Sequence, residues 1–376
     1  MILLGMPDLK PHVAAACFSV LLIFLGFYRI KKQTLSFWIL LFLVIYFVLV
    51  AVLNLIELLC TNGYDLYTEF GIWFINIALF IVASDRDVWR YVQQHQKMVV
   101  LLYMFYVLPI FFLLFSSGCA TESHFNLRIA IWISGMANLF EYGVSYQSFG
   151  DKIAILTFVI LSLPIVAKLK TAVVIIALST LYVVGSKASM VGFIFACVSY
   201  YVILLGLNKR YLKFASIMFI SICLLCSGLV YIIDNSSFQD SDNWLIRTLA
   251  RGRGDISVSG RRLIEEDNEK TRSSRILLGD YKFDNKLGRP GSYTHSAWGI
   301  VDYYGLPIFI ITVGIWLYLL FKLLLAARKT PIAKAALMSM LFYTLLFSIA
   351  RFPPVSYLTY WTLGMSITGC QDKNKV

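Results

Sequence analysis

Apolar runs of membrane-spanning length recur along the whole chain and alternate with short polar segments. A helix of about 20 predominantly apolar residues is long enough to cross the hydrocarbon core of a bilayer. The pattern predicts about eleven spans, within a range of about 10 to 12, of which the shorter ones cross at a tilt or re-enter. The predicted spans are residues 11–28, 37–60, 70–83, 98–115, 152–167, 171–185, 189–207, 214–233, 297–321, 335–350 and 355–369. We therefore expect an all-α polytopic membrane protein.

The composition agrees with this pattern. Hydrophobic residues make up 59% of the chain and charged residues only 14%, whereas soluble domains are typically about 25% charged. The first apolar run is followed at once by Arg29, Lys31 and Lys32 and lacks a small-residue cleavage site. This pattern predicts a retained helix rather than a signal peptide.

Lysine and arginine concentrate in alternate loops. These residues are Arg29, Lys31, Lys32, Arg86, Arg90, Lys97, Lys168, Lys170, Lys209, Arg210, Lys213, Lys322, Arg328, Lys329, Lys334, Lys373 and Lys375. Loops rich in lysine and arginine face the cytoplasm, so the pattern predicts an outside N-terminus and a cytoplasmic C-terminus. The formal net charge of +12 then reflects topology, and we expect no nucleic-acid partner.

Two outer segments, 116–151 and 234–296, are longer than a connection requires. The second contains 11 basic and 10 acidic residues, and its middle predicts a helix at about 258–275. A loop of this length without structure of its own is unusual unless it is functional. The chain thus divides into a bundle of about eight spans at 1–233, the large outer loop, and the last three spans with a cytoplasmic tail at 297–376.

Arginine outnumbers lysine by eight to three in the large outer loop. Its arginines are Arg247, Arg251, Arg253, Arg261, Arg262, Arg272, Arg275 and Arg289. The planar guanidinium binds phosphate in a bidentate fashion, which the ammonium of lysine does not. For any single arginine here, solvation or a weak surface ion pair is the alternative; the cluster as a whole favours an anionic ligand.

Two further cations lie at the outer membrane edge. Lys187 follows a serine in the tight turn "VVGSKASMVGF", and Arg351 lies between the last two spans in "IARFPPVSY". A charge at the membrane boundary is a functional candidate, and snorkelling of the side chain to the surface is the alternative.

His295 lies where the large loop meets the next apolar run, in "GSYTHSAWGIVDYYGL". Because histidine titrates near neutral pH, it can take a proton from a sugar hydroxyl during bond formation. Asp302 follows seven residues later and would share a helix face with His295 if the helix already begins there. It could then orient the imidazole, although a helix cap or a surface carboxylate is the simpler interpretation. A hydrogen-bonded structural histidine is the alternative for His295 itself.

Metal and cysteine chemistry have little support in the sequence. "DRD" at 85–87 and "DSD" at 240–242 match the Asp-x-Asp pattern of sugar-nucleotide enzymes, but the triplet is short enough to occur by chance. Of the seven cysteines, Cys223 and Cys226 have CxxC spacing, but both lie within the predicted span 214–233, where they indicate small apolar packing. No glycine-rich phosphate loop or HExxH motif is present. We expect no metal site, no cofactor and no disulfide framework.

Three stretches resemble the O-antigen polymerase and O-antigen ligase superfamily of bacterial inner-membrane glycosyltransferases. "GSKASMVGF" at 185–193 is similar to the family's "SR" turn, with Lys187 in place of the usual arginine. "SGRRLI" at 259–264 resembles the "GR" that opens the helix of its periplasmic loop. In "GSYTHSAWGIVDYYGLPIF", His295 and Gly305 match the family's "HN" and later glycine, while Ser296 replaces the asparagine.

The resemblance implies a fold of the integral-membrane (GT-C-like) glycosyltransferase type, with its large loop in the periplasm. It implies that His295 activates the acceptor, and that Lys187 with Arg261 or Arg262 binds the diphosphate of an undecaprenyl-diphosphate-linked oligosaccharide. From the loop cluster we add Arg251, Arg275 and Arg289 as further diphosphate-binding candidates. The expected partners are this glycolipid, membrane lipids and a chain-length-regulating membrane protein.

Polymerase and ligase share this chemistry and differ in the acceptor. We favour the polymerase, because polymerases diverge most in sequence and this chain matches only the sparse motif. A transporter or flippase is a different alternative. Coupled transporters usually need ionisable groups at mid-membrane, and Glu57 with Asn54 is the main such feature in these spans.

Overall fold

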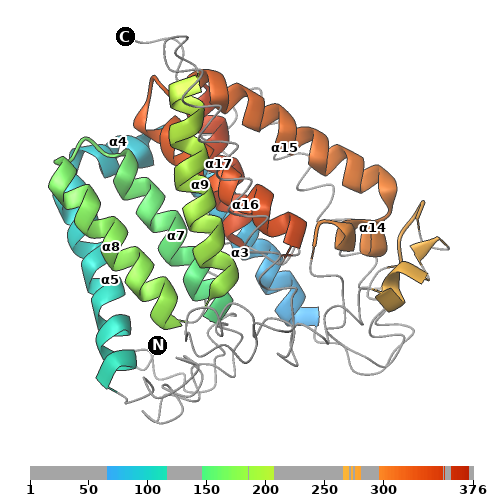
Figure 1. Cartoon of the computed structure of the whole chain (residues 1–376). Coiled ribbons are helices and arrows are strands. Elements are labelled where there is room, and N and C mark those ends of the chain that lie inside the picture. The colour runs from blue at the N-terminus through green and yellow to red at the C-terminus, as the bar shows by residue number, and fades with distance from the viewer. Residues whose placement is uncertain are drawn as a thin grey trace. The chain divides into compact units, whose positions relative to one another are not determined.

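The structure of the protein is a computed structural model, which describes residues 66–116, 146–184, 186–206, 266–270, 272–273, 276–280, 296–349, 351 and 357–371. Within these residues all regular structure is helical (Figure 1). The helices are α3 (Leu66–Ser84), α4 (Arg86–Gln94), α5 (Gln96–Ser116), α7 (Tyr146–Ser162), α8 (Ala167–Val184), α9 (Lys187–Gly206), α14 (Trp298–Tyr304), α15 (Leu306–Ala326), α16 (Pro331–Ile349) and α17 (Tyr357–Gln371).

Most predicted spans that fall on described residues coincide with one helix to within a few residues. They are 70–83 with α3, 98–115 with α5, 171–185 with α8, 189–207 with α9, 335–350 with α16 and 355–369 with α17. The predicted spans at 11–28, 37–60 and 214–233 lie outside the described residues. The expected all-α class is confirmed for the described part of the chain, and the number of spans stays a prediction.

Two predicted spans have the wrong limits. The helix assigned to 152–167 is α7, which begins at Tyr146 and ends at Ser162. It ends there because the residue before a proline is driven out of the helical region, and Pro164 follows. The span assigned to 297–321 is divided at Gly305 into the short helix α14 and the long helix α15.

Two of the described helices are long and apolar enough to cross a membrane. They are α15 and the Pro331–Ser348 part of α16. Only 17% of the apolar window of α15 is buried within the protein, against 67% for α16. The outward side chains of α15 include Ile310, Leu317 and Phe321, so this helix presents the surface that a lipid environment would cover.

The described chain forms two compact units. The first comprises Met1–Phe193, Ile315–Tyr343 and Pro354–Val376, and the second comprises Ile194–Gly314 and Thr344–Pro353. The boundaries fall within α9, α15 and α16, which therefore contribute residues to both units.

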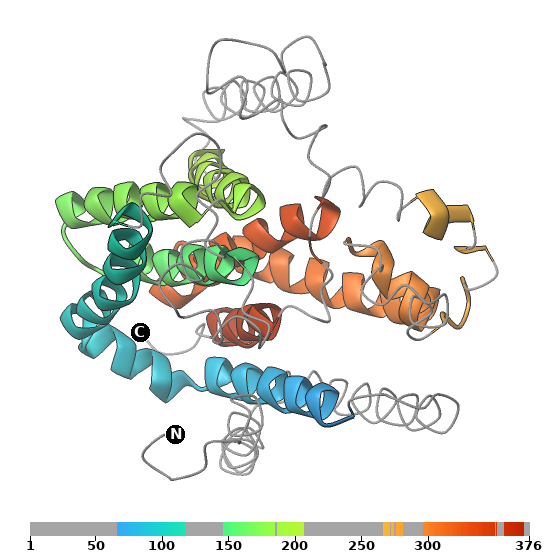
Figure 2. The same cartoon turned by 90° about the horizontal axis from the view of Figure 1, so that it is seen from below.

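In the first unit, α3 and α17 lie side by side (Figure 1, Figure 2). Gly364 of α17 makes this contact close, because a Cβ at this position would lie 2.4 Å from the carbonyl oxygen of Phe80. The Thr368 hydroxyl lies 3.2 Å from the carbonyl oxygen of Ala83 and donates to it. Small residues allow helix backbones to approach closely in membrane proteins, which accounts for the glycine here.

Loops that carry described members of the predicted cytoplasmic cations lie at one end of the first unit. Figure 1 shows α4, the beginning of α8 and the turn between α15 and α16 at this end. Arg86 donates to the carbonyl oxygen of Gln371 at 3.1 Å. Burial, and then the neighbouring charge of Lys334, lower the pKa of the Lys170 ammonium. The convergence of loops that are far apart in the sequence agrees with the alternate-loop charge pattern.

The short helix α4 explains the "DRD" triplet. The Asp85 side chain caps the helix by accepting the backbone N–H of Asp87 at 2.9 Å. Asp87 in turn pairs with Arg90 at 3.2 Å on an exposed face. Trp89 is buried, donates to the carbonyl oxygen of Ala83 and lies against Trp361. Helix capping therefore accounts for an aspartate that a metal-site pattern also matches.

Candidate functional site

The structure describes two of the predicted site residues. It describes the backbone of Lys187, which is the first residue of α9 in the first unit, and the whole of Asp302, which lies on α14 in the second unit. The other predicted site residues lie outside the described part of the chain: His295, Arg251, Arg261, Arg262, Arg275 and Arg289. Their roles stay predictions.

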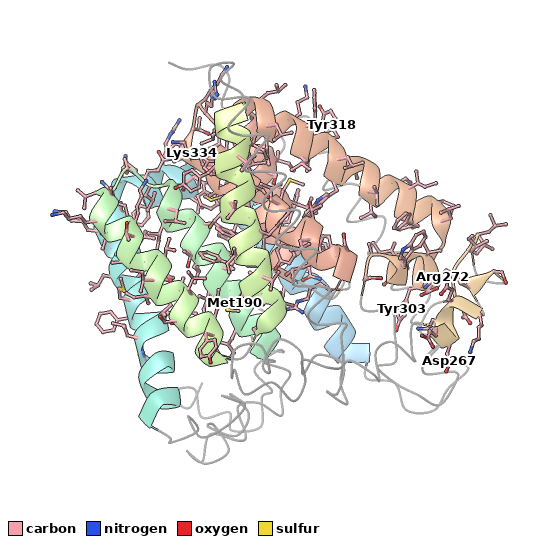
Figure 3. The ribbon with its side chains drawn as sticks, viewed as in Figure 1. Met190, Asp267, Arg272, Tyr303, Tyr318 and Lys334 are labelled. Atoms are coloured by element: carbon pink, nitrogen blue, oxygen red, sulfur yellow. The ribbon has the colours of Figure 1, made fainter. Side chains whose placement is uncertain are left out.

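A buried hydrogen-bond chain supports the turn that contains Lys187. Ser189 donates to the Oδ1 atom of Asp151 at 2.6 Å, and the hydroxyls of Ser186 and Ser189 are 2.6 Å apart. Because the single proton of Ser189 is directed to the carboxylate, Ser186 is the donor in the second bond. The Met190 N–H, labelled one turn into α9 in Figure 3, donates to the Ser186 carbonyl oxygen. The chain joins the first turns of α9 to α7 and thereby sets the position of the Lys187 backbone.

Asp151 was not among the predicted site residues. The sequence assigned it to the end of the polar segment 116–151, where a carboxylate has many ordinary roles. The structure instead buries it, with 3% of its surface exposed. The signal available in the sequence was the position of Asp151, directly before an apolar run. That position does not tell whether the carboxylate is buried in a hydrogen-bond network or solvated at the membrane edge.

The corner between α14 and α15 requires a glycine. Gly305 has φ 84° and ψ 168°, a combination that is essentially restricted to glycine. A Cβ at this position would lie 2.2 Å from the carbonyl oxygen of Leu277. The next residue, Leu306, donates its N–H to the carbonyl oxygen of Ile276 at 2.7 Å. The loop segment 276–280 is therefore packed directly against the corner.

A second set of contacts extends this packing to α14. The Asp280 N–H donates to the carbonyl oxygen of Asp302 at 2.8 Å. Gly279 has φ 70°, and a Cβ there would lie 2.4 Å from the backbone nitrogen of Tyr304. Two glycines on facing segments thus permit the close approach of two backbones, and hydrogen bonds then hold them together.

Arg272 and Asp302 form a bidentate ion pair beside this corner. The guanidinium Nε lies 2.9 Å from Oδ1 and a terminal nitrogen lies 3.3 Å from Oδ2. The Asp302 side chain is fully buried and that of Arg272 is 16% exposed. The Arg272 Cζ also lies 5.5 Å from the Trp298 ring centroid, and Trp298 stacks on Phe309. Figure 3 shows Arg272 and Tyr303 in the same part of the second unit.

This geometry corrects the interpretation of Asp302 as a helix cap or surface carboxylate. Asp302 lies in the interior of α14 and is buried. The helix begins at Trp298, so the premise that His295 and Asp302 share a helix face is wrong. Arg272 is also not a solvated loop arginine, because a buried carboxylate binds its guanidinium. An orienting action of Asp302 on His295 stays a prediction.

The predicted loop helix at 258–275 is confirmed in part. Residues 266–270 and Arg272 are helical, whereas Ser273 lies in a turn. Asp267 and Lys270 form an exposed ion pair at 3.3 Å, as expected for a solvated face. Asn268 is the exception, since it is 4% exposed and faces the protein.

The C-terminal end of α16 brings together two segments of the second unit. The Phe347 carbonyl oxygen accepts the N–H of Ala297 at 2.7 Å, and the Leu346 carbonyl oxygen accepts the N–H of Arg351 at 2.8 Å. The last carbonyls of a helix have no partner within it, so both bonds satisfy the helix terminus. Ala297 is two residues after His295, so the segment that follows the predicted base is anchored to α16 at Ala297.

Comparison with known proteins adds no identity. No protein-family model matches the chain, and no curated protein matches it significantly.

Proposed function

We propose that the protein is an O-antigen polymerase, or the polymerase of a related surface polysaccharide. In this proposal it joins undecaprenyl-diphosphate-linked repeat units at the periplasmic face of a bacterial inner membrane, with about eleven spans in a GT-C-like fold. The observation that carries the proposal is the motif from His295 to Gly305. The backbone conformation of Gly305, and its contact with the loop segment 276–280, give a physical reason for a glycine at this place in the motif.

The proposed reaction transfers a glycosyl group without a metal. The oxygen of an acceptor sugar hydroxyl forms a bond to the anomeric carbon of the donor, while His295 takes the hydroxyl proton. The bond from the anomeric carbon to the diphosphate oxygen breaks, and undecaprenyl diphosphate leaves with the electron pair. Lys187 and the loop arginines stabilise the negative charge that grows on the leaving diphosphate.

Replacement of His295 tests the proposal. We expect His295→Ala to leave membrane insertion intact and to slow glycan transfer about 100-fold or more, the usual scale for a positioned acid–base group. His295→Gln should not restore transfer, because an amide cannot take a proton at neutral pH. His295→Arg should fail as well, since arginine stays charged. Glycan chain length in cells with matched protein levels is the measurement, and full-length chains from His295→Ala would refute the base assignment.

The lipopolysaccharide of a deletion strain separates the polymerase from the other functions. Core carrying one repeat unit indicates a lost polymerase. Accumulated lipid-linked polymer with bare core indicates a lost ligase. Deletion of 245–290 should abolish the activity of a loop-dependent enzyme, whereas a transporter would retain function without that segment.

The proposed topology has its own test. A reporter that is active only in the periplasm should be active when fused at Ser257. The matched control is the same reporter fused at Lys329, in the turn between α15 and α16, where we expect no activity. The opposite result at both positions would invert the orientation and remove the periplasmic mechanism.

A further inference from the structure

The described part of the large outer loop exposes two chemically different surfaces. The exposed side chains of residues 266–270 are all charged, as expected for a surface in water. Ile276, Leu277 and Leu278 form a turn in which all three apolar side chains are exposed. Leu277 is 68% exposed and Leu278 is 87% exposed. Contiguous apolar surface is unfavourable in water and marks an interaction site when it is not covered by the protein itself.

This apolar turn, residues 276–278, is fixed at the beginning of α15. The Ile276 carbonyl oxygen accepts the N–H of Leu306, the first residue of α15, at 2.7 Å. On the other side of the turn, the Asp280 N–H donates to the carbonyl oxygen of Asp302. Since α15 is long and apolar enough to cross a membrane, the apolar turn lies at the level where that span begins.

Further apolar side chains are exposed around the same corner. Ile310 and Ile311, in the first turns of α15, are both exposed. Trp298 of α14 is half-exposed, and its ring stacks on Phe309 with the centroids 5.3 Å apart. Tryptophan is enriched at the boundary between membrane and water, where its apolar ring and its N–H group both find suitable surroundings. The corner therefore has the side chains that are typical of a membrane interface.

The ion pair beside this surface carries no net charge. Arg272 lies 5.5 Å from the Trp298 ring centroid, measured from Cζ, and its guanidinium binds both carboxylate oxygens of Asp302. An uncompensated charge at a membrane boundary is costly. Because each member of this pair compensates the other, the corner can lie against lipid at a low electrostatic cost.

We propose that the apolar turn inserts into the membrane interface beside the beginning of α15, where lipid acyl chains cover Leu277 and Leu278. Lipid is the partner that the geometry favours, because the turn is bonded to the first residue of a helix whose apolar window is only 17% buried. The anchor would hold the arginine-rich loop close to the membrane surface. The inference requires that α15 spans the membrane, and it does not depend on the proposed reaction.

Spin labels on the full-length protein in lipid nanodiscs test the inference. A spin-labelled amino acid is introduced by amber suppression at position 278 or 267, so that the native cysteines are left unchanged. Both positions are exposed, and the label should therefore not disturb the fold. Oxygen concentrates among acyl chains, whereas a hydrophilic nickel complex stays in water. We expect the label at 278 to collide more often with oxygen than with the nickel complex, and the label at 267 to show the reverse preference.

A label at position 310 separates the possible failures. Ile310 is exposed on α15 and should prefer oxygen, as a lipid-facing position does. A preference for the nickel complex at 310 would remove α15 from the membrane, and the membrane architecture of the proposed function would fail together with the inference. If 310 prefers oxygen and 278 prefers the nickel complex, the turn is in water and only the inference fails. If 278 is shielded from both reagents, protein covers the turn, for example in a second copy of the chain, and the lipid assignment is refuted.

Discussion

Asp151 and Asp302 are both buried carboxylates, but their partners differ. Asp151 lies beside the turn that contains Lys187, and Asp302 lies on the helix that follows His295 in the sequence. Asp151 accepts a hydrogen bond from the neutral hydroxyl of Ser189 in a chain that joins two helices of the first unit. Asp302 accepts two hydrogen bonds from the charged guanidinium of Arg272 in the second unit. The first arrangement stabilises a short turn, and the second holds a loop residue 30 positions away in the sequence.

The difference reflects the conformational entropy that each segment loses when it is ordered. A tight turn between consecutive helices loses little chain entropy when it is ordered, so hydrogen bonds from neutral hydroxyls suffice. Ordering a segment of a long loop costs more, because every fixed residue loses backbone freedom. In the second unit, a bidentate ion pair, backbone hydrogen bonds and two closely packed glycines together offset that cost.

The largest expected effect belongs to Gly305→Ala. Alanine at φ 84° and ψ 168° is strained by about 1–3 kcal/mol, and its Cβ would overlap the Leu277 carbonyl oxygen. We expect a loss of about 4 kcal/mol in the free energy of unfolding, measured by denaturation in detergent. The matched control is Gly314→Ala in α15, where a Cβ meets nothing within 4 Å. Gly314→Ala should slightly raise the free energy of unfolding, because alanine favours a helix more than glycine does.

Asp302→Ala should have the next largest effect. It leaves the mostly buried guanidinium of Arg272 without its carboxylate, and breaking a buried pair typically costs about 3–5 kcal/mol. The partial exposure of Arg272 places the expected loss near the lower end, at about 3 kcal/mol. Asp267→Ala breaks the exposed pair with Lys270 in the same loop and should change stability by less than about 1 kcal/mol. Equal effects of the two variants would show that burial of the Arg272 pair contributes nothing.

Replacement of Lys187, in the turn beside Asp151, should change the rate of glycan transfer. The hypothesis requires a cation near a diphosphate, so Lys187→Arg should keep glycan transfer. Lys187→Ala should reduce transfer about tenfold or more, because a charged hydrogen bond is worth about 1.5–3 kcal/mol. Transfer rates in membranes at matched protein levels measure the effect. Equal rates for all three proteins would identify Lys187 as a snorkelling surface residue.

Ser189→Ala should have the smallest effect. It removes the donor to Asp151, and the expected loss of stability is about 1–2 kcal/mol because a buried acceptor loses a hydrogen bond. Ser348→Ala is the control, since that exposed hydroxyl binds the Thr344 carbonyl oxygen of its own helix. We expect no measurable change there. A loss as large as that of Asp302→Ala would contradict the distinction between neutral and charged partners.

Hydrophobic pattern alone predicted most of the described helices. Each apolar run is long, and within it the backbone can satisfy its hydrogen bonds only as a helix when water is absent. The pattern located α3, α5, α8, α9, α16 and α17, and it indicated the exposed helical face at 266–270. It failed at local breaks within apolar runs, because the limit of α7 depends on Pro164 and the corner at Gly305 depends on packing against a distant loop segment.

The sequence by itself therefore determined the helical class, the candidate spans and the residue types of the candidate site. Those properties follow from local composition and from the charge of each loop. Only the tertiary structure decided that Asp302 binds Arg272, that Asp151 lies in a hydroxyl network, and that the Ala297 N–H binds the Phe347 carbonyl oxygen at the end of α16. Each of these contacts joins residues that are far apart in the chain, or depends on burial, and neither distance in space nor burial of a polar group can be read from hydrophobic periodicity.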